Sequence, residues 1–273
     1  MPELPEVETV IGVLKNIVIG KRISEVEIYW NNIISINNIG SFKHDLIDQE
    51  IINITRRGKY ILMELTDFVL ITHLRMEGKF YFHESKVSKD KHTHVIICFS
   101  DDTFLHYHDV RKFGKMYLYH KDEEFTCLSN LGPEPWDKEL TVPYLKHRFR
   151  NKKHPIKTLL LDQSIVAGIG NIYANEICFS TRIDPRTSAS HLSDDKLLDI
   201  IVATQSILEK AIQLGGTTIK SYTSSLGVTG LFQQELFVHG RENEPCKICS
   251  TNIEKIKLGG RGTYYCPSCQ ELL

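Results

Sequence analysis

Apolar residues at the start of the chain recur every three or four positions. They are Leu4, Val7, Ile11, Leu14 and Val18. This spacing predicts an amphipathic helix with one buried face. Pro5 suits its first turn, where a missing backbone N–H leaves no hydrogen bond unmade.

Between about residues 22 and 120 the pattern changes to short, strand-like runs that are separated by turn residues such as Gly58 and Gly78. The predicted strands cover residues 23–30, 50–57, 59–65, 68–74, 79–83, 94–100, 103–108 and 115–120. So many short strands in succession indicate two packed antiparallel sheets. We expect the first helix to lie along this sandwich and to bring Pro2 to its edge.

The segment LGPEPWD, residues 131–137, holds one glycine and two prolines and is typical of a linker. Helical patterns follow it, and one helix is expected between a capping Ser193 and the pair Gly215–Gly216. The predicted fold class is therefore α+β, with an N-terminal helix and a two-sheet β-sandwich before a helical domain and a zinc-finger hairpin. The predicted parts are a β-sandwich domain with its leading helix (1–130), a linker (131–140), a helical domain (141–235) and a zinc finger (236–273).

The zinc finger is predicted from four cysteines near the end of the chain. Cys246 and Cys249 are separated by two residues, as are Cys266 and Cys269, and sixteen residues lie between the pairs. This spacing indicates one tetrahedral zinc ion, which is structural because four thiolates leave no position for water. The other three cysteines (Cys98, Cys127 and Cys178) form no disulfide framework.

Composition places few further limits on function. The 273 residues are 41% hydrophobic and 25% charged, with a formal net charge of -1. No signal peptide or long apolar run is evident, so we expect a cytoplasmic protein. The net charge argues weakly against nucleic-acid binding, although basic residues gather between 146 and 157. Such a run is usually a solvated face.

The first residues carry the most specific chemistry. If Met1 is removed, Pro2 has a free secondary amine, which is partly neutral and nucleophilic near pH 7. Such an amine can attack a sugar C1′, release a base and form an iminium ion. Glu3 and Glu6 are neighbours in the first turn of the predicted helix, where one can move a proton and the other can orient the amine.

The opening MPELPEVETV resembles that of the bacterial formamidopyrimidine-DNA glycosylases, and the resemblance extends over the whole chain. It implies a bifunctional repair enzyme that excises oxidised purines such as 8-oxoguanine from double-stranded DNA. The strand is then cut by β,δ-elimination at the abasic site. In this family the N-terminal proline attacks C1′ and the next glutamate is the acid and base. These roles fall to Pro2 and Glu3, with Glu6 as a supporting carboxylate, in a protein expected to be a monomer.

The same resemblance implies a set of DNA contacts. Lys59 in RRGKY, His73 in THLRMEG and Asn171 in AGIGNIYANE match phosphate-binding residues, and Arg261 matches the phosphate clamp of the finger. The resemblance places Lys59 and Arg261 with the catalytic residues. Because AGIGNIYANE matches the family's helix-two-turns-helix motif, residues 141–235 are expected to be a helix-two-turns-helix DNA-binding domain and residues 1–130 the catalytic domain. Met76, Arg111 and Phe113 match side chains that fill the space of an extruded nucleotide. Residues 216–231 resemble a loop that closes over the base, with Lys220 as a contact. The chain departs from the family at VHGR, where His239 replaces a tyrosine that is common there.

Two other readings remain open. The related glycosylases for oxidised pyrimidines share the proline, the glutamate and the finger, although they usually open with PEGPE. A non-catalytic zinc-ribbon DNA-binding protein is the second alternative. Pro2, Glu3 and Lys59 together argue against it, while Met76, Arg111 and Phe113 favour the purine branch.

Overall fold

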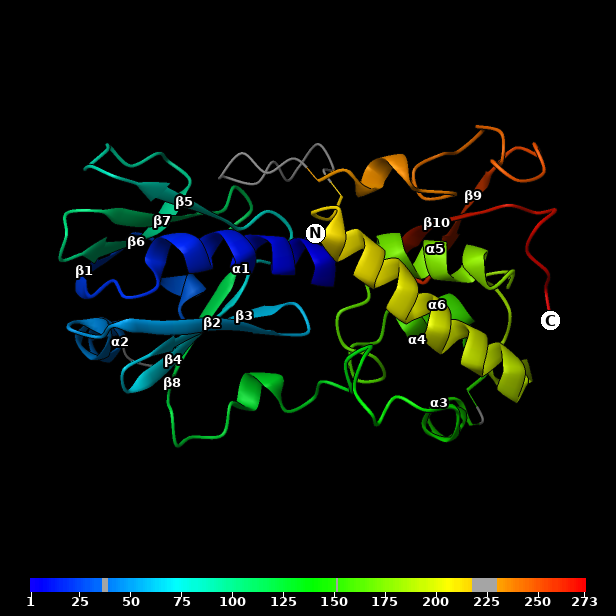
Figure 1. Cartoon of the computed structure of the whole chain (residues 1–273), viewed down its shortest axis with the longest axis horizontal. Coiled ribbons are helices and arrows are strands. Elements are labelled where there is room, and N and C mark those ends of the chain that lie inside the picture. Colours follow the sequence, from blue (N-terminus) through cyan, green and yellow to red (C-terminus); the bar gives the residue numbers. More distant parts are fainter. Residues whose placement is uncertain (36–38, 151, 218–229) are drawn as a thin grey trace. The chain divides into compact units, whose positions relative to one another are not determined.

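A computed structural model describes residues 1–35, 39–150, 152–217 and 230–273. The chain divides into two compact units (Figure 1). Unit 1 comprises residues 1–129 and 215–230, and unit 2 comprises residues 130–214 and 231–273. The four parts predicted from the sequence divide the chain more finely and stay a prediction.

Unit 1 is built from two four-stranded antiparallel sheets and the N-terminal helix (Figure 1). One sheet has the order β1-β6-β7-β5 and the other β2-β3-β4-β8. The elements are α1 (Leu4–Val18), β1 (Ile23–Ile28), α2 (Ile39–Leu46), β2 (Ile51–Arg57), β3 (Tyr60–Leu65), β4 (Phe68–His73), β5 (Lys79–His83), β6 (Thr93–Phe99), β7 (Phe104–His108) and β8 (Lys115–His120).

The core of unit 1 joins α1 to both sheets, as the sequence pattern predicts. Leu4, Val7, Ile11, Leu14 and Val18 are all at most 2% exposed. All eight predicted strands are present within one or two residues of their expected limits. The helix α2 was not predicted, because its sequence IGSFKHDL buries only two side chains and so carries little periodicity.

Unit 2 contains four α-helices in its described part and a C-terminal hairpin. They are α3 (Val142–Phe149), α4 (Ile156–Leu160), α5 (Asn171–Ser180) and α6 (Asp194–Gln213), followed by β9 (Glu254–Leu258) and β10 (Arg261–Tyr265). The predicted cap of α6 is confirmed, since Ser193 Oγ accepts a hydrogen bond from Lys196 N. Its end is also as expected, because Gly215 and Gly216 both have positive φ.

None of the helices in the described ranges combines the length and the apolar character that crossing a membrane requires.

Candidate active site and nucleic-acid interface

The N-terminus of α1 is organised by two glutamates that cap each other's backbone. Glu3 N donates to Glu6 Oε2 at 2.8 Å, and Glu6 N donates to the Glu3 carboxylate. Both side chains are at least 96% buried. This capping box satisfies N–H groups that a helix start otherwise leaves without partners. It therefore fixes two carboxylates beside the first residues of the chain.

The amino terminus lies among charged groups in this buried setting. Burial lowers the pKa of the Met1 amino group, Glu3 and Glu6 oppose that shift, and Lys59 adds to it. Lys59 is 5% exposed and follows Gly58 in the two-residue turn between β2 and β3. Gly58 has φ +57°, a conformation that glycine adopts without strain. The structure thus brings together the first residues of the chain, the two glutamates and Lys59.

Glu6 also binds a distant segment of unit 1. Its Oε1 accepts hydrogen bonds from Thr217 N at 2.8 Å and from Thr217 Oγ1 at 3.0 Å. A Cβ on Gly216 would lie 2.8 Å from the same oxygen, so only glycine fits there. Thr217 is the last described residue before 218–229, and Lys220, the predicted contact in that segment, lies outside the described residues.

His73, the last residue before the turn that follows β4, is a neutral hydrogen-bond donor. Its Nδ1 accepts from Arg75 N at 2.9 Å, which leaves the proton of the neutral ring on Nε2. Burial, with smaller effects from Arg75 and Lys59, lowers the pKa of His73 to about 3. Tyr60 packs edge-on against the imidazole, with ring centroids 4.5 Å apart. Met76 lies half-buried in the same turn.

We expect His73 to make the protein less stable in acid. The folded pKa is lowered, so the unfolded chain takes up the proton first. The stability due to the neutral ring is complete above pH ~6.5 and is lost toward pH ~3, by about 1.4 kcal/mol per pH unit. Urea unfolding at several pH values measures this slope. His73→Gln should flatten it and His44→Gln, an exposed control, should not; equal slopes for parent and His73→Gln would contradict the prediction.

A buried aspartate shapes the loop before β8. Asp109 is fully buried, and its carboxylate accepts from the backbone N–H groups of Arg111, Phe113 and Gly114 at 3.0, 2.9 and 2.8 Å. The loop leaves Phe113 50% exposed, with the Arg111 guanidinium 4.7 Å from the centre of its ring. An apolar ring held at the surface beside a cation is suited to entering a stack of bases.

We expect Asp109→Asn to loosen this loop. The amide nitrogen cannot accept a hydrogen bond, so at least one buried N–H loses its partner, which costs about 1–3 kcal/mol. Hydrogen exchange at the amides of Phe113 and Gly114 should accelerate, while Asp102→Asn, at an exposed turn, should change neither amide. Unchanged protection in Asp109→Asn would show that the loop is held by other contacts.

In unit 2, α4 and α5 hold the turn between β9 and β10. Asn171 Nδ2 and Lys157 Nζ both donate to Gly262 O, at 3.1 and 3.0 Å, and Lys157 also donates to Thr263 Oγ1 at 2.7 Å. Asn171 Oδ1 is buried and has no hydrogen-bond partner among the described residues. Gly259 and Gly260 form the turn with positive φ, and the exposed Arg261 begins β10 directly after it rather than within it.

A buried carboxylate positions the segment that leads into the finger. Glu176 accepts from the backbone N–H groups of Phe237, Val238 and His239 at 2.8, 3.0 and 2.8 Å. His239 Nδ1 lies 2.7 Å from Asn175 Nδ2, and burial lowers the pKa of His239 to about 4. Because the amide group donates to Nδ1, the neutral ring carries its proton on Nε2. His239 is therefore equipped to donate a hydrogen bond, as the tyrosine common at this position would.

The four cysteines predicted as metal ligands form one cluster. Their Sγ atoms all lie within 4.8 Å of one another, with Cys246 and Cys269 at 3.9 Å and Cys249 and Cys266 at 3.4 Å. Thiolates at about 2.3 Å from a tetrahedral zinc ion are about 3.8 Å apart, so the spacing fits zinc. Of the three remaining cysteines, Cys98 and Cys178 are buried, and burial raises the pKa of Cys178 to about 12. Neither of these two is therefore a reactive thiolate.

Comparison with known proteins decides the family. The models "Formamidopyrimidine-DNA glycosylase N-terminal domain", "Formamidopyrimidine-DNA glycosylase H2TH domain" and "Zinc finger found in FPG and IleRS" match residues 1–116, 131–223 and 243–272. The formamidopyrimidine-DNA glycosylase of Bacillus cereus is 47% identical over 99% of both chains. The chain belongs to the formamidopyrimidine-DNA glycosylase family. It is thus a DNA glycosylase of DNA repair with a structural zinc finger.

Solved structures of this family have the same fold. The Fpg of Lactococcus lactis in complex with DNA that contains an abasic site has a TM-score of 0.92 at 38% identity, over 98% of this chain and 99% of that one. The same protein in complex with DNA that contains an oxidised pyrimidine has a TM-score of 0.91 at 38% identity, over 99% and 100% of the two chains.

The sequence does not reveal the buried residues that hold the segments of this glycosylase site in place. Lys157 belongs to a basic run that is expected to be solvated, but it is 1% exposed. Its neighbours in the PIKTLLL segment are apolar, which is the available signal. No pattern in the sequence indicates that Glu176 accepts hydrogen bonds from the backbone of residues 237–239, or that Thr217 donates to Glu6.

Proposed function

We propose that the protein is a bifunctional DNA glycosylase and AP lyase that excises oxidised purines and then cuts the strand. One observation carries the proposal: Pro2 is buried at the start of α1 together with Glu3, Glu6 and Lys59. Burial disfavours the protonated form of an amine, so the amine that Pro2 gains on removal of Met1 has a larger neutral, nucleophilic fraction near pH 7. A buried amine among carboxylates has no evident structural purpose at a chain end.

The proposed chemistry begins when Met1 is removed and Pro2 becomes the first residue. The Pro2 nitrogen attacks C1′ of the damaged nucleotide, the bond from C1′ to the base breaks, and the base leaves with the proton that the attacking amine gives up. Glu3 protonates the sugar O4′ as the ring opens and the iminium forms. Loss of a C2′ proton then expels the 3′ phosphate, and a second elimination expels the 5′ phosphate. Glu6 holds Glu3 N and Thr217 and so keeps the acid in place.

The proposed DNA contacts lie on both units, and each is supported by its local geometry. In unit 1, Lys59 and the neutral His73 are assigned to phosphates. The exposed Phe113 and Arg111, with Met76, are assigned to the space left by the extruded nucleotide. In unit 2 the phosphate ligands are Asn171 and Arg261, which share the Gly262 segment, and the ring of His239 is a further donor. Lys220 stays a prediction.

The lesion class is argued from the relatives and from the loop. A formamidopyrimidine is a ring-opened purine, and the relatives take their name from it. The exposed Phe113 supports the purine branch. An oxidised pyrimidine is the second candidate substrate, because the Lactococcus lactis Fpg has been solved with such DNA. We also propose that the protein acts as a monomer on double-stranded DNA.

Borohydride trapping tests the proposal. Borohydride reduces the iminium to a stable amine, so active protein becomes covalently attached to its substrate DNA. We expect trapping on 8-oxoguanine and abasic-site duplexes and weaker trapping on thymine-glycol duplexes. Stronger trapping on thymine glycol would move the protein to the pyrimidine branch. DNA binding without trapping on any of the three would support the non-catalytic alternative.

Removing a zinc ligand should abolish DNA binding while sparing unit 1. Cys249→Ala leaves three thiolates, so the β9–β10 hairpin is no longer fastened and Arg261 is not presented. We expect one zinc ion per chain and a loss of affinity of at least ~100-fold, since Arg–phosphate contacts depend on geometry. Metal analysis measures the zinc content and DNA titration measures the affinity. Cys127→Ala is the control for both measurements. Active protein without zinc would refute the assignment.

A further inference from the structure

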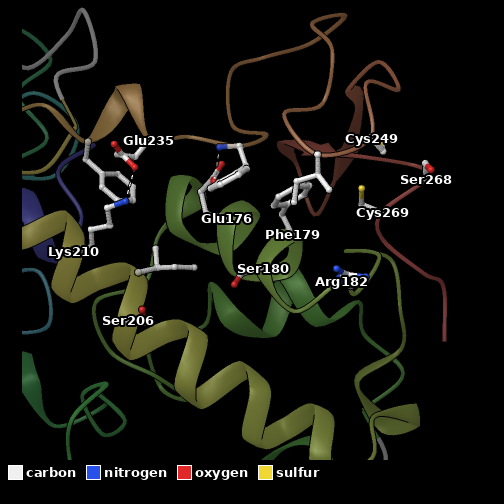
Figure 2. A pocket seen from close by; sticks show the side chains of 14 residues that line it. Glu176, Phe179, Ser180, Arg182, Ser206, Lys210, Glu235, Cys249, Ser268 and Cys269 are labelled. Carbon is white, nitrogen blue, oxygen red and sulfur yellow. Dashed lines mark hydrogen bonds and ion pairs between the residues drawn. The ribbon is translucent and has the colours of Figure 1, made fainter.

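A cleft in unit 2 lies apart from the residues assigned to DNA. It has a volume of about 430 Å³ and is formed by α5, α6, the short helix Phe232–Gln234 and the zinc finger (Figure 2). Pockets of a few hundred Å³ with apolar walls are typical of small-molecule sites. Neither Pro2 and its partners nor the contacts assigned to phosphates line it.

The wall of the cleft is aromatic. Phe179 and Phe237 stack with ring centroids 5.1 Å apart and planes 22° from parallel, and Ile207 and Ile248 extend the apolar surface. Phe237 is 38% exposed and Ile248 is 62% exposed, and both line the cleft, while Lys247 Nζ lies 5.4 Å from the centre of the Phe237 ring. A flat aromatic ring placed against the exposed parts of these side chains would remove apolar surface from water.

The polar groups of the cleft leave one positive charge without a partner. Lys210 pairs with Glu235 at one end, and the carboxylate of Glu176 is satisfied by three backbone N–H groups (Figure 2). Arg182 lies at the other end, near the finger, where the zinc ligands Cys249 and Cys269 also line the cleft, and it has no carboxylate partner among the described residues. The hydroxyl groups of Ser180, Ser206 and Ser268 also line the cleft and have no hydrogen-bond partner in the described part of the chain.

We propose that this cleft binds a small aromatic anion, a ring system of one or two fused rings that bears one carboxylate or phosphate. The ring packs against the exposed parts of Phe237 and Ile248, and the anionic group binds the guanidinium of Arg182, whose planar fork matches two oxygens. The serine hydroxyl groups satisfy the remaining oxygens or a ring nitrogen. The buried Glu176 does not repel the ligand strongly, because its charge already faces three N–H donors.

Calorimetric titration of the zinc-loaded full chain tests this site. The probe is indole-2-carboxylate, and the matched neutral probe is indole-2-carboxamide. We expect one carboxylate per chain, bound at least ~tenfold more weakly by Arg182→Gln, because a charged hydrogen-bond pair is lost. Arg150→Gln, the same change at an exposed position outside the cleft, should leave the affinity unchanged. The carboxamide should bind the parent and Arg182→Gln equally.

Phe237→Ala separates the aromatic part of the site from the charge. It should weaken the carboxylate and the carboxamide by the same factor, and Arg182→Gln gives an independent test if this variant folds poorly. No binding of the carboxylate at millimolar concentration would overturn the proposal. So would equal affinity of the carboxylate for the parent and Arg182→Gln. The readout is binding alone, so neither result depends on the catalytic function proposed above.

Discussion

Glu3→Gln is expected to bind lesion DNA as the parent does but to lose base excision from an 8-oxoguanine duplex by a factor of ~10² to 10⁴, the usual contribution of a general acid or base. The glutamine oxygen can still accept from Glu6 N, so the start of α1 and the stability of the fold should be unchanged. What the amide cannot do is give or take the proton that departure of the base and ring opening require.

The two activities should separate in this variant. A duplex that already contains an abasic site needs no base departure, so strand cleavage should survive in part through the Pro2 amine. Single-turnover assays on the two duplexes, side by side, measure the division. Glu25→Gln, an exposed glutamate on β1, is the control and should match the parent on both. Excision of 8-oxoguanine by Glu3→Gln at the parent rate would reduce Glu3 to a helix cap.

A protein with a residue before Pro2 is expected to lose both base release and strand cleavage. Retained Met1, or one added glycine, turns the Pro2 nitrogen into an amide without a usable lone pair. Loss of a nucleophile lowers rates by on the order of 10⁴-fold or more. Stability should not change, because the capping box is made by Glu3 and Glu6. Pro2→Gly keeps a free amine and should slow both steps without abolishing them.

Intact-mass spectrometry before and after borohydride trapping follows the same molecules through the reaction. The trapped fraction should contain only protein that lacks Met1. Adding a cleavable glycine and then removing it provides the control, because activity should return with the free amine. Protein that retains Met1 on every molecule and is nevertheless fully active would exclude the amine of Pro2 as the nucleophile.

The fold could be predicted where local pattern and final packing agree. The alternating strands of unit 1, the capped α6 and the cysteine spacing are of this kind, because each is set by residues close in sequence. The helix α2 escapes prediction because only Phe42 and Leu46 are buried in it. The burial of Lys157 escapes it for a different reason, since the partners of its ammonium group lie on β10, more than a hundred residues away.

The candidate site shows the same limit. Pro2, Glu3 and Lys59 stand in short motifs and can be named from the sequence alone. The groups that hold site residues in place cannot, because their role exists only after folding. Glu176 has no distinguishing sequence context on α5, because its partners are the backbone N–H groups of residues 237–239, which reach it only in the folded chain. Thr217 lies in a polar stretch that has no periodicity at all.

The link between Glu6 and Thr217 has a consequence for how the protein is made. Unit 1 consists of residues 1–129 and a second segment, residues 215–230, which is synthesised only after most of unit 2. On the ribosome, Glu6 is among the first residues to emerge, and it lacks both hydrogen bonds from Thr217 until the chain is four-fifths complete. The proposed catalytic end of the nascent protein is therefore assembled late, and a fragment that stops at residue 129 lacks the Thr217 groups that hold Glu6.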